Sequence, residues 1–378
     1  MELRIAVSEF SRALSMMQGI VQRKNTMPIL ANVLLQVETT EDGAGKLTLA
    51  ATDLDVAMRT ERPCEVLEAG SVTIPARALS DMVRVLPGPD VTLKKLTNNH
   101  IEVKSGRTKA KLMGLSAEEY PNLPDYNEVP FVQLDAALFA DMVEKTIYAA
   151  STDETRYNLN GILFEPDAEN PSKLVMVSTD GHRLVRIERT FENAEFPAKE
   201  SVILPRKGIG ELRRLFDSSD GESDTLDIGF HSNHAVMKKG NTVLGMRLID
   251  GTFPDYRQVI PKLADKVVRI SRPETVDSLR RVSVLAADKG QPVKLSLGKD
   301  QLTVACSNPD TGEISDDVPV EYAGDGVEVA FNARYLVDAL ASLDDQNVLL
   351  KLTDNLSPGL LVGVDETHQL CVVMPMRL

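Results

Sequence analysis

The feature that most constrains the fold of this 378-residue chain is an internal repeat that divides it into three parts of similar length. Residues 74–86, 204–216 and 331–343 align at offsets of 130 and then 127, and their apolar side chains fall on the same positions in each copy. The spacing i, i+3, i+4, i+7 predicts one amphipathic helix of about three turns per copy. Arg213 is the one misfit on this apolar face. A repeat of this kind predicts three copies of one structural unit.

A second helix is predicted near the start of each copy. In the first two copies its apolar face recurs at nearly the same offset, as Phe10, Ala13, Leu14 and Met17 and then as Phe139, Met142, Val143 and Thr146. In the third copy, Ser271 and Glu274 have the spacing of a capping box. Between the helices, residues 29–37, 46–53 and 173–180 are predicted to be strands, and residues 93–106 a hairpin.

These patterns predict an α+β chain of three similar modules, each with two helices on an antiparallel sheet. The offsets put the modules at residues 1–127, 128–258 and 259–378, and the Pro-containing stretches 120–126 and 253–261 lie where linkers are expected. The pair Thr52–Asp53 of the first module recurs in the second as Thr179–Asp180, each time at the end of a predicted strand.

Composition argues against several classes of protein. The chain carries 42 basic and 56 acidic residues, a net charge of −14, which taken alone argues against nucleic acid as a partner. Three cysteines far apart in the sequence argue against a disulfide framework. Its apolar stretches fall well short of the roughly 20 residues of a membrane helix, and the start lacks the layout of a signal peptide. We therefore expect a cytoplasmic protein that does not bind to a membrane.

The motifs of known enzymes are missing or have a simpler explanation. Residues 43–48, GAGKLT, lack the spacer of a phosphate-binding loop, and the five histidines are scattered along the chain. Asp180 and His182, close to Ser178, could form the acid–base pair of a hydrolase. A hairpin turn at Asp-Gly-His explains the same residues and is favoured. We expect no catalytic residue, no metal and no cofactor.

Several landmarks carry a resemblance to a known family. The motifs TDGHRL at 179–184, FPDYR at 253–257 and VMPMRL at 373–378 closely resemble those of the bacterial sliding clamp, the beta subunit of DNA polymerase III. The resemblance runs from MPILANVLLQV at 27–37, through LPRKG at 204–208, to the last residue. It implies a non-catalytic processivity factor of DNA replication. It also implies a head-to-tail homodimer, closed into a ring around duplex DNA of any sequence, with the helices lining the hole.

The resemblance also reconciles the acidic net charge with DNA binding. Basic side chains on the helices would line the hole, while the acidic exterior would repel other nucleic acid. The implied DNA-facing residues are Arg12, Arg23, Lys24, Arg77, Arg84, Lys145, Lys207, Arg214, Arg280, Arg281 and Arg334. Taken without the resemblance, the same basic stripes are explained as solvated faces of surface helices.

In clamps, a hydrophobic groove between the second and third modules binds short linear peptides of polymerases, the clamp loader and repair proteins. The matching residues here are Leu159, Thr179, Gly181, His182, Arg183, Leu184, Pro254, Val259, Leu356, Val372, Val373, Met374, Pro375, Met376 and Arg377. Methionine adapts to different apolar anchors, and the two arginines can bind acidic parts of a ligand. Pro375 lacks the N–H that a central strand needs, so the last five residues are expected to line a surface.

For the dimer contact, the resemblance implies that residues 107–112 pair with the third module. The candidate interface residues are Lys109, Leu112, Val284 and Leu285. Two alternative functions stay open at this point. One is a repeat scaffold that binds only proteins, and the other is the hydrolase that uses Asp180 and His182.

Overall fold

The structure is a computed structural model that describes residues 1–21, 27–124, 126, 128–192, 194–196, 201–217, 223–262, 264–286, 291–365 and 368–377. The chain divides into two compact units. The first contains Met1–Ala137 and Lys207–Leu248, and the second contains Leu138–Arg206 and Ile249–Leu378. Each unit is described by itself below.

The elements follow one order six times: a strand, a helix and three further strands. The first copy contains β1 (Glu2–Ala6), α1 (Val7–Ile20), β2 (Asn32–Thr39), β3 (Gly45–Thr52), β4 (Val56–Pro63), then β6 (Gly70–Pro75), α2 (Ala76–Val83), β7 (Asp90–Lys95), β8 (Ile101–Ser105) and β9 (Thr108–Leu112), with an extra strand β5 (Glu65–Glu68). The second contains β10 (Phe131–Asp135), α3 (Ala136–Ile147), β11 (Gly161–Pro166), β12 (Lys173–Thr179), β13 (Arg183–Thr190), then β14 (Val202–Pro205), α4 (Arg206–Asp217), β15 (Thr225–His231), β16 (His234–Lys239) and β17 (Thr242–Arg247).

The third copy repeats this order. It contains β18 (Lys266–Ser271), α5 (Arg272–Val282), β19 (Val293–Gly298), β20 (Gln301–Asn308), β21 (Gly312–Glu321), then β22 (Val327–Phe331), α6 (Ala333–Ala341), β23 (Asn347–Leu352), β24 (Gly359–Gly363) and β25 (Gln369–Val373). In the described part of the chain, four short 3₁₀ helices lie between the larger elements: η1 (Pro28–Ala31), η2 (Ala117–Glu119), η3 (Tyr157–Leu159) and η4 (Tyr256–Gln258). Each copy thus has two α-helices and antiparallel strands, as the sequence predicts.

The strands form blocks of four in which the two halves of each copy exchange their first strands. In the first copy these blocks are β6-β2-β3-β4 and β1-β7-β8-β9, so β1 pairs with the strands that follow α2. The second copy has the blocks β14-β11-β12-β13 and β10-β15-β16-β17, and the third has β22-β19-β20-β21 and β18-β23-β24-β25. Sharing of the first strands binds the two halves of each copy together.

Two seams join neighbouring copies into larger sheets. In the first unit β4 pairs with β17, and in the second unit β13 pairs with β25, each time antiparallel. Val56 faces Met246 at the first seam, and Arg183 faces Val373 at the second. Positions 183 and 373 each lie 127 residues after positions 56 and 246, so the two seams have the same register. The repeat therefore governs not only the modules but also the way in which they join.

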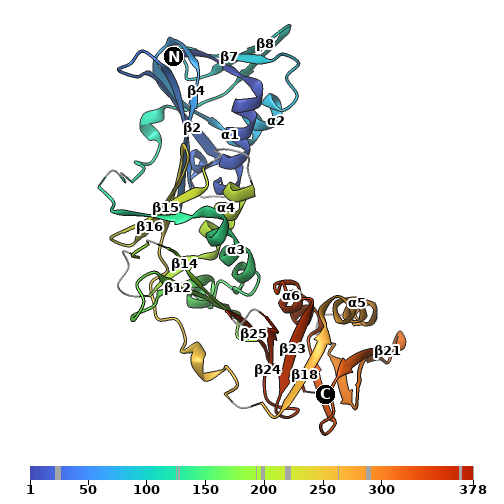
Figure 1. The fold of residues 1–378 in the computed structure, drawn as a ribbon. Coiled ribbons are helices and arrows are strands. Elements are labelled where there is room, and N and C mark those ends of the chain that lie inside the picture. The colour runs from blue at the N-terminus through green and yellow to red at the C-terminus, as the bar shows by residue number, and fades with distance from the viewer. Residues whose placement is uncertain are drawn as a thin grey trace. The chain divides into compact units, whose positions relative to one another are not determined.

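The helices bury their apolar faces against one side of these sheets. In the first unit α1 packs on β3, β4 and α2, and in the second α5 lies beside α6 (Figure 1). The predicted apolar residues of α1 and α3 are all fully buried: Phe10, Ala13, Leu14, Met17, Phe139, Met142, Val143 and Thr146. This agreement confirms the prediction of an α+β fold with two amphipathic helices in each copy.

Local details differ from the sequence prediction for physical reasons. The three equivalent helices α2, α4 and α6 each begin two residues later than predicted, because residues 74–75, 204–205 and 331 end the preceding strands. In the first two cases the second residue is a proline, which holds the residue before it in an extended conformation. Residues 29–31 lie in η1 and not in a strand. Ser271 is the N-cap residue of α5, but its side chain makes no capping hydrogen bond, so the predicted capping box is wrong.

Candidate peptide-binding seam and basic helix faces

The C-terminal tail is fixed in the second unit by the seam between β13 and β25. Leu184 faces Val372 across the seam, and Val372 in turn faces Leu360 of β24. Beyond the strand, the Met374 N–H donates to the carbonyl of His182 at 2.8 Å. The Met376 N–H donates to the carbonyl of Ala330 at 2.8 Å. The tail therefore continues beyond β25 beside the TDGHRL turn.

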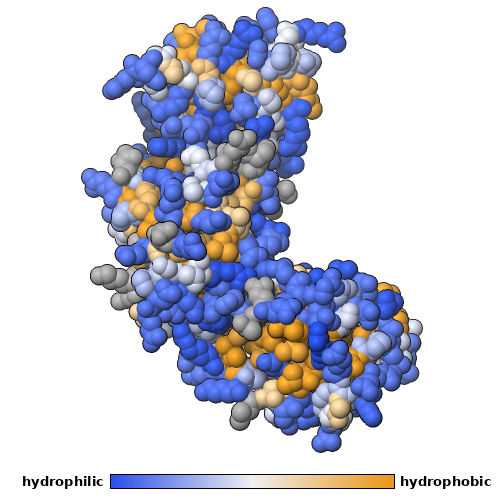
Figure 2. Space-filling model, in the orientation of Figure 1, coloured by the Kyte–Doolittle hydropathy of each residue, from blue (hydrophilic) through white to orange (hydrophobic). Residues whose placement is uncertain are grey.

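An apolar cluster covers the face of this seam. Leu184, Val372 and Leu360 pack with Leu163, Val175, Val177, Ile203, Phe253 and Tyr256, and Ile249, Ile260, Val362 and Leu370 lie partly buried against them. Phe253 and Tyr256 come from the segment that links the second copy to the third. Apolar surface is visible over β23, β24 and β25 in Figure 2, at the place that Figure 1 labels.

The other predicted groove residues differ in exposure. Leu356 and Val259 are 73% and 39% exposed, so both are available to a ligand. Pro254, Gly181, His182 and Arg377 are exposed, and Thr179, Met374, Pro375 and Met376 are half-buried, while Leu159 is buried. Val373 is placed apart from Val372, because successive side chains of a strand point to opposite faces. It is completely buried in the main core of the third copy, together with Val185.

The Thr-Asp pair forms the same turn at both seams. The Thr179 hydroxyl donates to the carbonyl of Arg183 at 2.6 Å and accepts from the Gly181 N–H. Asp180 Oδ1 accepts from the backbone N–H groups of residues 182 and 183. Thr52 and Asp53 make the equivalent four hydrogen bonds with residues 54–56. The position after the aspartate has a positive φ in both turns, 88° at Gly181 and 83° at Leu54.

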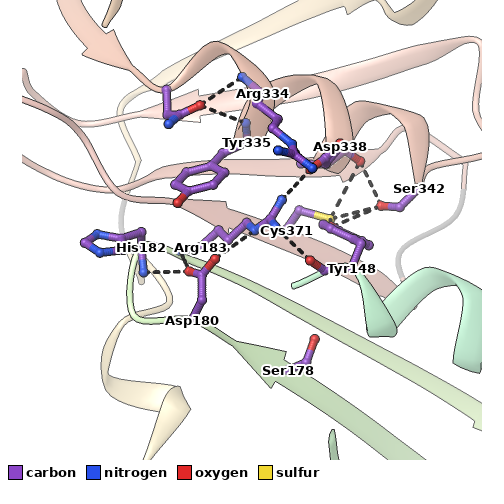
Figure 3. A network of polar contacts seen from close by, with 12 residues as sticks. Tyr148, Ser178, Asp180, His182, Arg183, Arg334, Tyr335, Asp338, Ser342 and Cys371 are labelled. Carbon is purple, nitrogen blue, oxygen red and sulfur yellow. Dashed lines mark hydrogen bonds and ion pairs between the residues drawn. The ribbon is translucent and has the colours of Figure 1, made fainter. Parts of the chain in front are cut away.

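Arg183 is the centre of a polar network beneath the tail (Figure 3). Its guanidinium donates to Asp180 Oδ2 at 3.1 Å, to Asp338 Oδ2 at 2.6 Å and to the carbonyl of Tyr148 at 2.7 Å. It lies 5.2 Å from the ring centroid of Tyr148 and 4.5 Å from that of Tyr335. The Arg183 side chain is only 11% exposed, so its donors hold β13 to α6 and to the residues after α3.

The network also determines what Asp180, His182 and Ser178 can do. Both carboxylate oxygens of Asp180 already accept hydrogen bonds from its own turn and from Arg183. The His182 ring is exposed and stacks on Tyr335, with 6.4 Å between ring centroids. The buried Ser178 hydroxyl donates to the carbonyl of Thr146 at 2.5 Å, away from the turn (Figure 3). These three groups do not form a hydrolytic triad, so the geometry favours the turn.

Most predicted DNA-facing residues lie on exposed helix faces. In the first unit Arg12 extends from α1, Arg77 from α2 and Arg214 from α4, and Arg84 follows α2 directly. In the second unit Arg280 and Arg281 extend from α5, and Arg334 extends from α6. Several pair with an acidic neighbour on the surface, such as Arg281 with Asp316 at 2.6 Å. Exposed ion pairs of this kind contribute about 0–1 kcal/mol, so the arginines can exchange them for a phosphate.

Two lysines of this set, Lys145 and Lys207, are held more tightly. Lys207 binds Asp53, whose side chain is buried, and donates to the carbonyl of Ile20 at 3.1 Å. Lys145 is 5% exposed and is paired with Asp141 at 2.9 Å and with Asp344. Burial lowers the pKa of Lys145, but its hydrogen bonds to the two carboxylates more than offset this and keep its pKa above the ordinary value. Lys145 thus functions as an internal tie within the second unit.

Comparison with known proteins gives a consistent result along the whole chain. Residues 1–124, 133–255 and 257–377 match the N-terminal, central and C-terminal domains of the DNA polymerase III beta subunit. The "Beta sliding clamp" of Vibrio cholerae is 34% identical, with both chains covered in full. The chain belongs to the bacterial beta sliding clamp family. Its function is that of a processivity clamp in DNA replication.

Solved sliding clamps share the fold over their full length. A sliding clamp of Bartonella birtlesii, in a structure bound to griselimycin, is 33% identical with a TM-score of 0.93, and each chain covers the other completely. A sliding clamp of Pseudomonas aeruginosa, in a structure with a ligand, is 32% identical with a TM-score of 0.89, again with full coverage of both chains. In this family the three copies of the fold are the three clamp domains.

The remaining candidates of this sliding clamp concern its sheet edges. Lys109 and Leu112 belong to β9, which is the terminal strand of its sheet. Val284 follows α5 and is 70% exposed, and Leu285 is partly buried against the core of the third copy. Arg23 and Lys24 lie outside the described residues. In the described part of the chain, no helix is long and apolar enough to cross a membrane, and no group of acidic, His and Cys side chains could hold a metal.

Sequence reasoning missed the partners of Arg183. Tyr148, Tyr335 and Asp338 come from two other segments of the chain, and no spacing in the sequence links them to Arg183. The repeat offered one signal. Asp53 pairs with Lys207 in the first unit, and their counterparts at the repeat offset are Asp180 and Arg334. That recurrence brings Asp180 near α6, where Tyr335 and Asp338 adjoin Arg334.

Proposed function

We propose that two copies of this chain join head to tail into a closed ring that encircles duplex DNA, with modules at residues 1–127, 128–258 and 259–378. The observation that carries the proposal is the common register of the two seams. Each seam joins the last strand of one block to the last strand of another, β17 to β4 and β25 to β13. Two blocks have a last strand that takes part in neither seam: β9 in the first copy and β21 in the third. By the same rule, these two strands would pair with each other.

The edges of β9 and β21 support this third seam. β9 ends its sheet, and among the described residues the edge of β21 opposite β20 is paired only at Val320 and Glu321, with β18. An open strand edge invites pairing with another chain, and a symmetric dimer that pairs β9 with β21 leaves neither of these two edges exposed. Lys109 and Leu112 on β9 would then lie near Val284 and Leu285 of the partner. Sedimentation of the purified chain tests this proposal, and a monomer at micromolar concentration would contradict it.

We propose that the basic helix residues face the DNA in the ring. Lys and Arg contacts with phosphates are independent of sequence and salt-sensitive, which suits a clamp that must slide. The exposed arginines of α1, α2, α4, α5 and α6 supply such contacts, while the net charge of −14 keeps other nucleic acid away. Lys145 and Lys207 are paired with carboxylates, so their own contribution to DNA binding would be small. After loading, we expect retention on circular DNA and loss from linear DNA, and equal loss from both would contradict encirclement.

We propose that the second seam binds short peptides of the replicative polymerase, the clamp loader and repair proteins. Leu184, Val372 and Leu360 form the floor, and the exposed Leu356 and Val259 with the half-buried tail form the walls. Burial of two apolar anchors contributes at most about 6 kcal/mol, while micromolar binding needs about 8 kcal/mol. Hydrogen bonds to the peptide must supply the rest, which predicts modest affinity and ready exchange.

A titration of a polymerase-derived clamp-binding peptide tests the groove. We expect micromolar binding to the full chain, and a loss of at least tenfold when the last five residues are deleted. Unchanged affinity after the deletion would contradict the role of the tail.

We further propose a cytoplasmic protein that catalyses no reaction. The scaffold alternative predicts that reversal of Arg77, Lys207 and Arg214 to Glu leaves DNA replication unaffected, whereas the ring predicts reduced processivity.

A further inference from the structure

A hollow in the first unit lies at its seam between β4 and β17. It is a cavity of about 550 Å³ on the face of the sheet that the first linker covers. Its apolar walls come from four different stretches of the chain: Leu34, Met58, Tyr120, Leu123 and Val243. The described residues 117–124 and Tyr126 form its cover, so the cavity lies between a linker and a sheet.

The first seam carries smaller side chains than the second seam. Ala57 faces Gly245 across the first seam, and their counterparts at the repeat offset, Leu184 and Val372, face each other across the second. In the second unit the two larger side chains fill the space beneath Phe253. In the first unit Tyr126, the counterpart of Phe253 at the repeat offset, fills the space over Gly245, and the cavity lies beside its ring, over Ala57.

The linker above the cavity is held in position independently of any ligand. Tyr120 is buried, and its hydroxyl accepts from the Thr52 N–H at 3.1 Å and donates to the carbonyl of Asn32. Tyr120 also packs with Ile29, Leu30, Leu34 and Ala50, in a smaller counterpart of the apolar cluster of the second unit. A preformed cavity of this kind spares a ligand the cost of ordering the cover.

The polar groups of the cavity suit a particular kind of ligand. Among the described residues of the lining, two side chains are cationic, Arg59 and Lys238, and one is a carboxylate, Glu61, so this part of the lining is net positive in a chain with a charge of −14. Lys238 also lies over the Phe131 ring, 3.8 Å from its centroid. Glu61 is already engaged by Lys46 at 3.4 Å and by Arg59 at 3.7 Å. The charge of the lining therefore complements an acidic group.

The lining also offers both donors and acceptors at close range. Gln36, Asn122 and Asn241 present carboxamide side chains, each of which can donate and accept hydrogen bonds. An extended peptide backbone exposes N–H and C=O groups alternately and needs partners of both kinds. Apolar walls, carboxamides and net positive charge together match a peptide with one large apolar side chain and a nearby carboxylate.

We propose that this cavity is a second peptide site of the clamp, which binds a short extended segment with an aromatic side chain next to an acidic residue. The aromatic ring enters the cavity over Ala57, beside Tyr126, and the carboxylate binds Arg59 or Lys238. The site is separate from the groove at the second seam, since its lining residues all belong to the first unit. It therefore does not depend on the tail of the chain.

Selection from a phage-displayed library of random heptapeptides on the full-length protein tests the proposal. The affinity of each selected peptide is then measured by fluorescence polarisation on the wild type, on Ala57→Leu and on the chain without its last five residues. Ala57→Leu gives the first seam the residue that the second seam has, and circular dichroism checks that the variant is folded. We expect a class of peptides, rich in Phe, Tyr or Trp beside Asp or Glu, that Ala57→Leu weakens at least tenfold and the tail deletion leaves unchanged.

A second variant tests the charge preference of the site. Arg59→Glu should weaken the same peptides at least fivefold and should spare peptides that the tail deletion weakens. The proposal is overturned if every selected peptide depends on the tail, or if folded Ala57→Leu binds all peptides as the wild type does. Because the two classes respond to different variants, failure of this site and failure of the second-seam groove are distinguishable.

Discussion

The substitution Arg183→Met should destabilise the second unit, although Arg183 was predicted from the sequence to contact a ligand. It removes three hydrogen bonds and leaves Asp338 and Asp180 without their buried cation. Loss of one partner from a buried pair costs about 3–5 kcal/mol. The Asp338 side chain is 30% exposed, so water will stabilise part of the unpaired charge. Loss of the contacts with the two tyrosine rings adds about 1 kcal/mol. Allowing for that solvation, we expect a net loss of about 2–4 kcal/mol.

Two measurements should report this loss. Urea unfolding followed by far-ultraviolet circular dichroism gives the change in stability, and dichroism is the suitable probe because the chain has no tryptophan. Hydrogen exchange measured on peptides from β13 and α6 shows whether the loss is confined to the second unit. A double-mutant cycle with Asp338→Asn should give a coupling energy of about 1–2 kcal/mol, because the two groups are in direct contact.

Arg334→Met is the matched control for Arg183→Met. Arg334 also lies near Asp338, but its nearest nitrogen is 3.9 Å from the carboxylate and its side chain is 85% exposed. An exposed pair of this kind contributes less than about 1 kcal/mol. If Arg334→Met destabilised the chain as much as Arg183→Met, or if Arg183→Met unfolded within about 0.5 kcal/mol of the wild type, the network would not be the tie described above.

Three further predictions follow from single residues. Burial raises the pKa of Glu188, but hydrogen bonds from Arg186 and Lys173 outweigh this and lower its pKa to about 2. Ionised Glu188 therefore stabilises the fold above its ordinary pKa of 4.5, and this contribution disappears as the pH falls toward 2. Glu188→Gln should lower stability by about 1 kcal/mol at pH 7, allowing for solvent screening, and the deficit should vanish in urea titrations near pH 2. Leu54 has a left-handed backbone where its counterpart is Gly181, so Leu54→Gly should raise the midpoint of urea unfolding, by about 0.5 kcal/mol in stability, and an unchanged or lower midpoint would contradict this. Val373→Ala should cost about 2 kcal/mol of stability without a change in peptide affinity, whereas Val372→Ala should weaken the peptide in a titration, and the reverse pattern would refute the assignment of their faces.

Local pattern was enough to predict much of this fold. The helices α1 and α3 could be predicted because their apolar side chains recur at helical spacing, and the TDGHRL turn because Asp-Gly-His separates two apolar runs. Equivalence of copies extended these predictions along the chain. Helix starts were less predictable, since apolar residues at positions 74, 204 and 331 fit the end of a buried strand as well as the first turn of a helix.

Contacts between distant segments could not be predicted in the same way. Lys145 fits an exposed basic stripe by its spacing, but Asp344, 199 residues away, holds it inside the second unit. Val372 and Val373 are identical residues at adjacent positions, and only the pairing of β25 with β13 decides which of them faces the helices. Register and long-range charge pairing are properties of the assembled sheet.

The exchange of first strands between the halves of each copy has a consequence for synthesis of the chain on the ribosome. β10 ends at Asp135, but its partner β15 begins at Thr225, and β18 must likewise wait for β23. At about 5–20 residues per second, the emerging β10 stays without its partner for several seconds. Folding of every copy is thus delayed until most of that copy has been translated, and we expect nascent clamps to bind chaperones that shield unpaired strands.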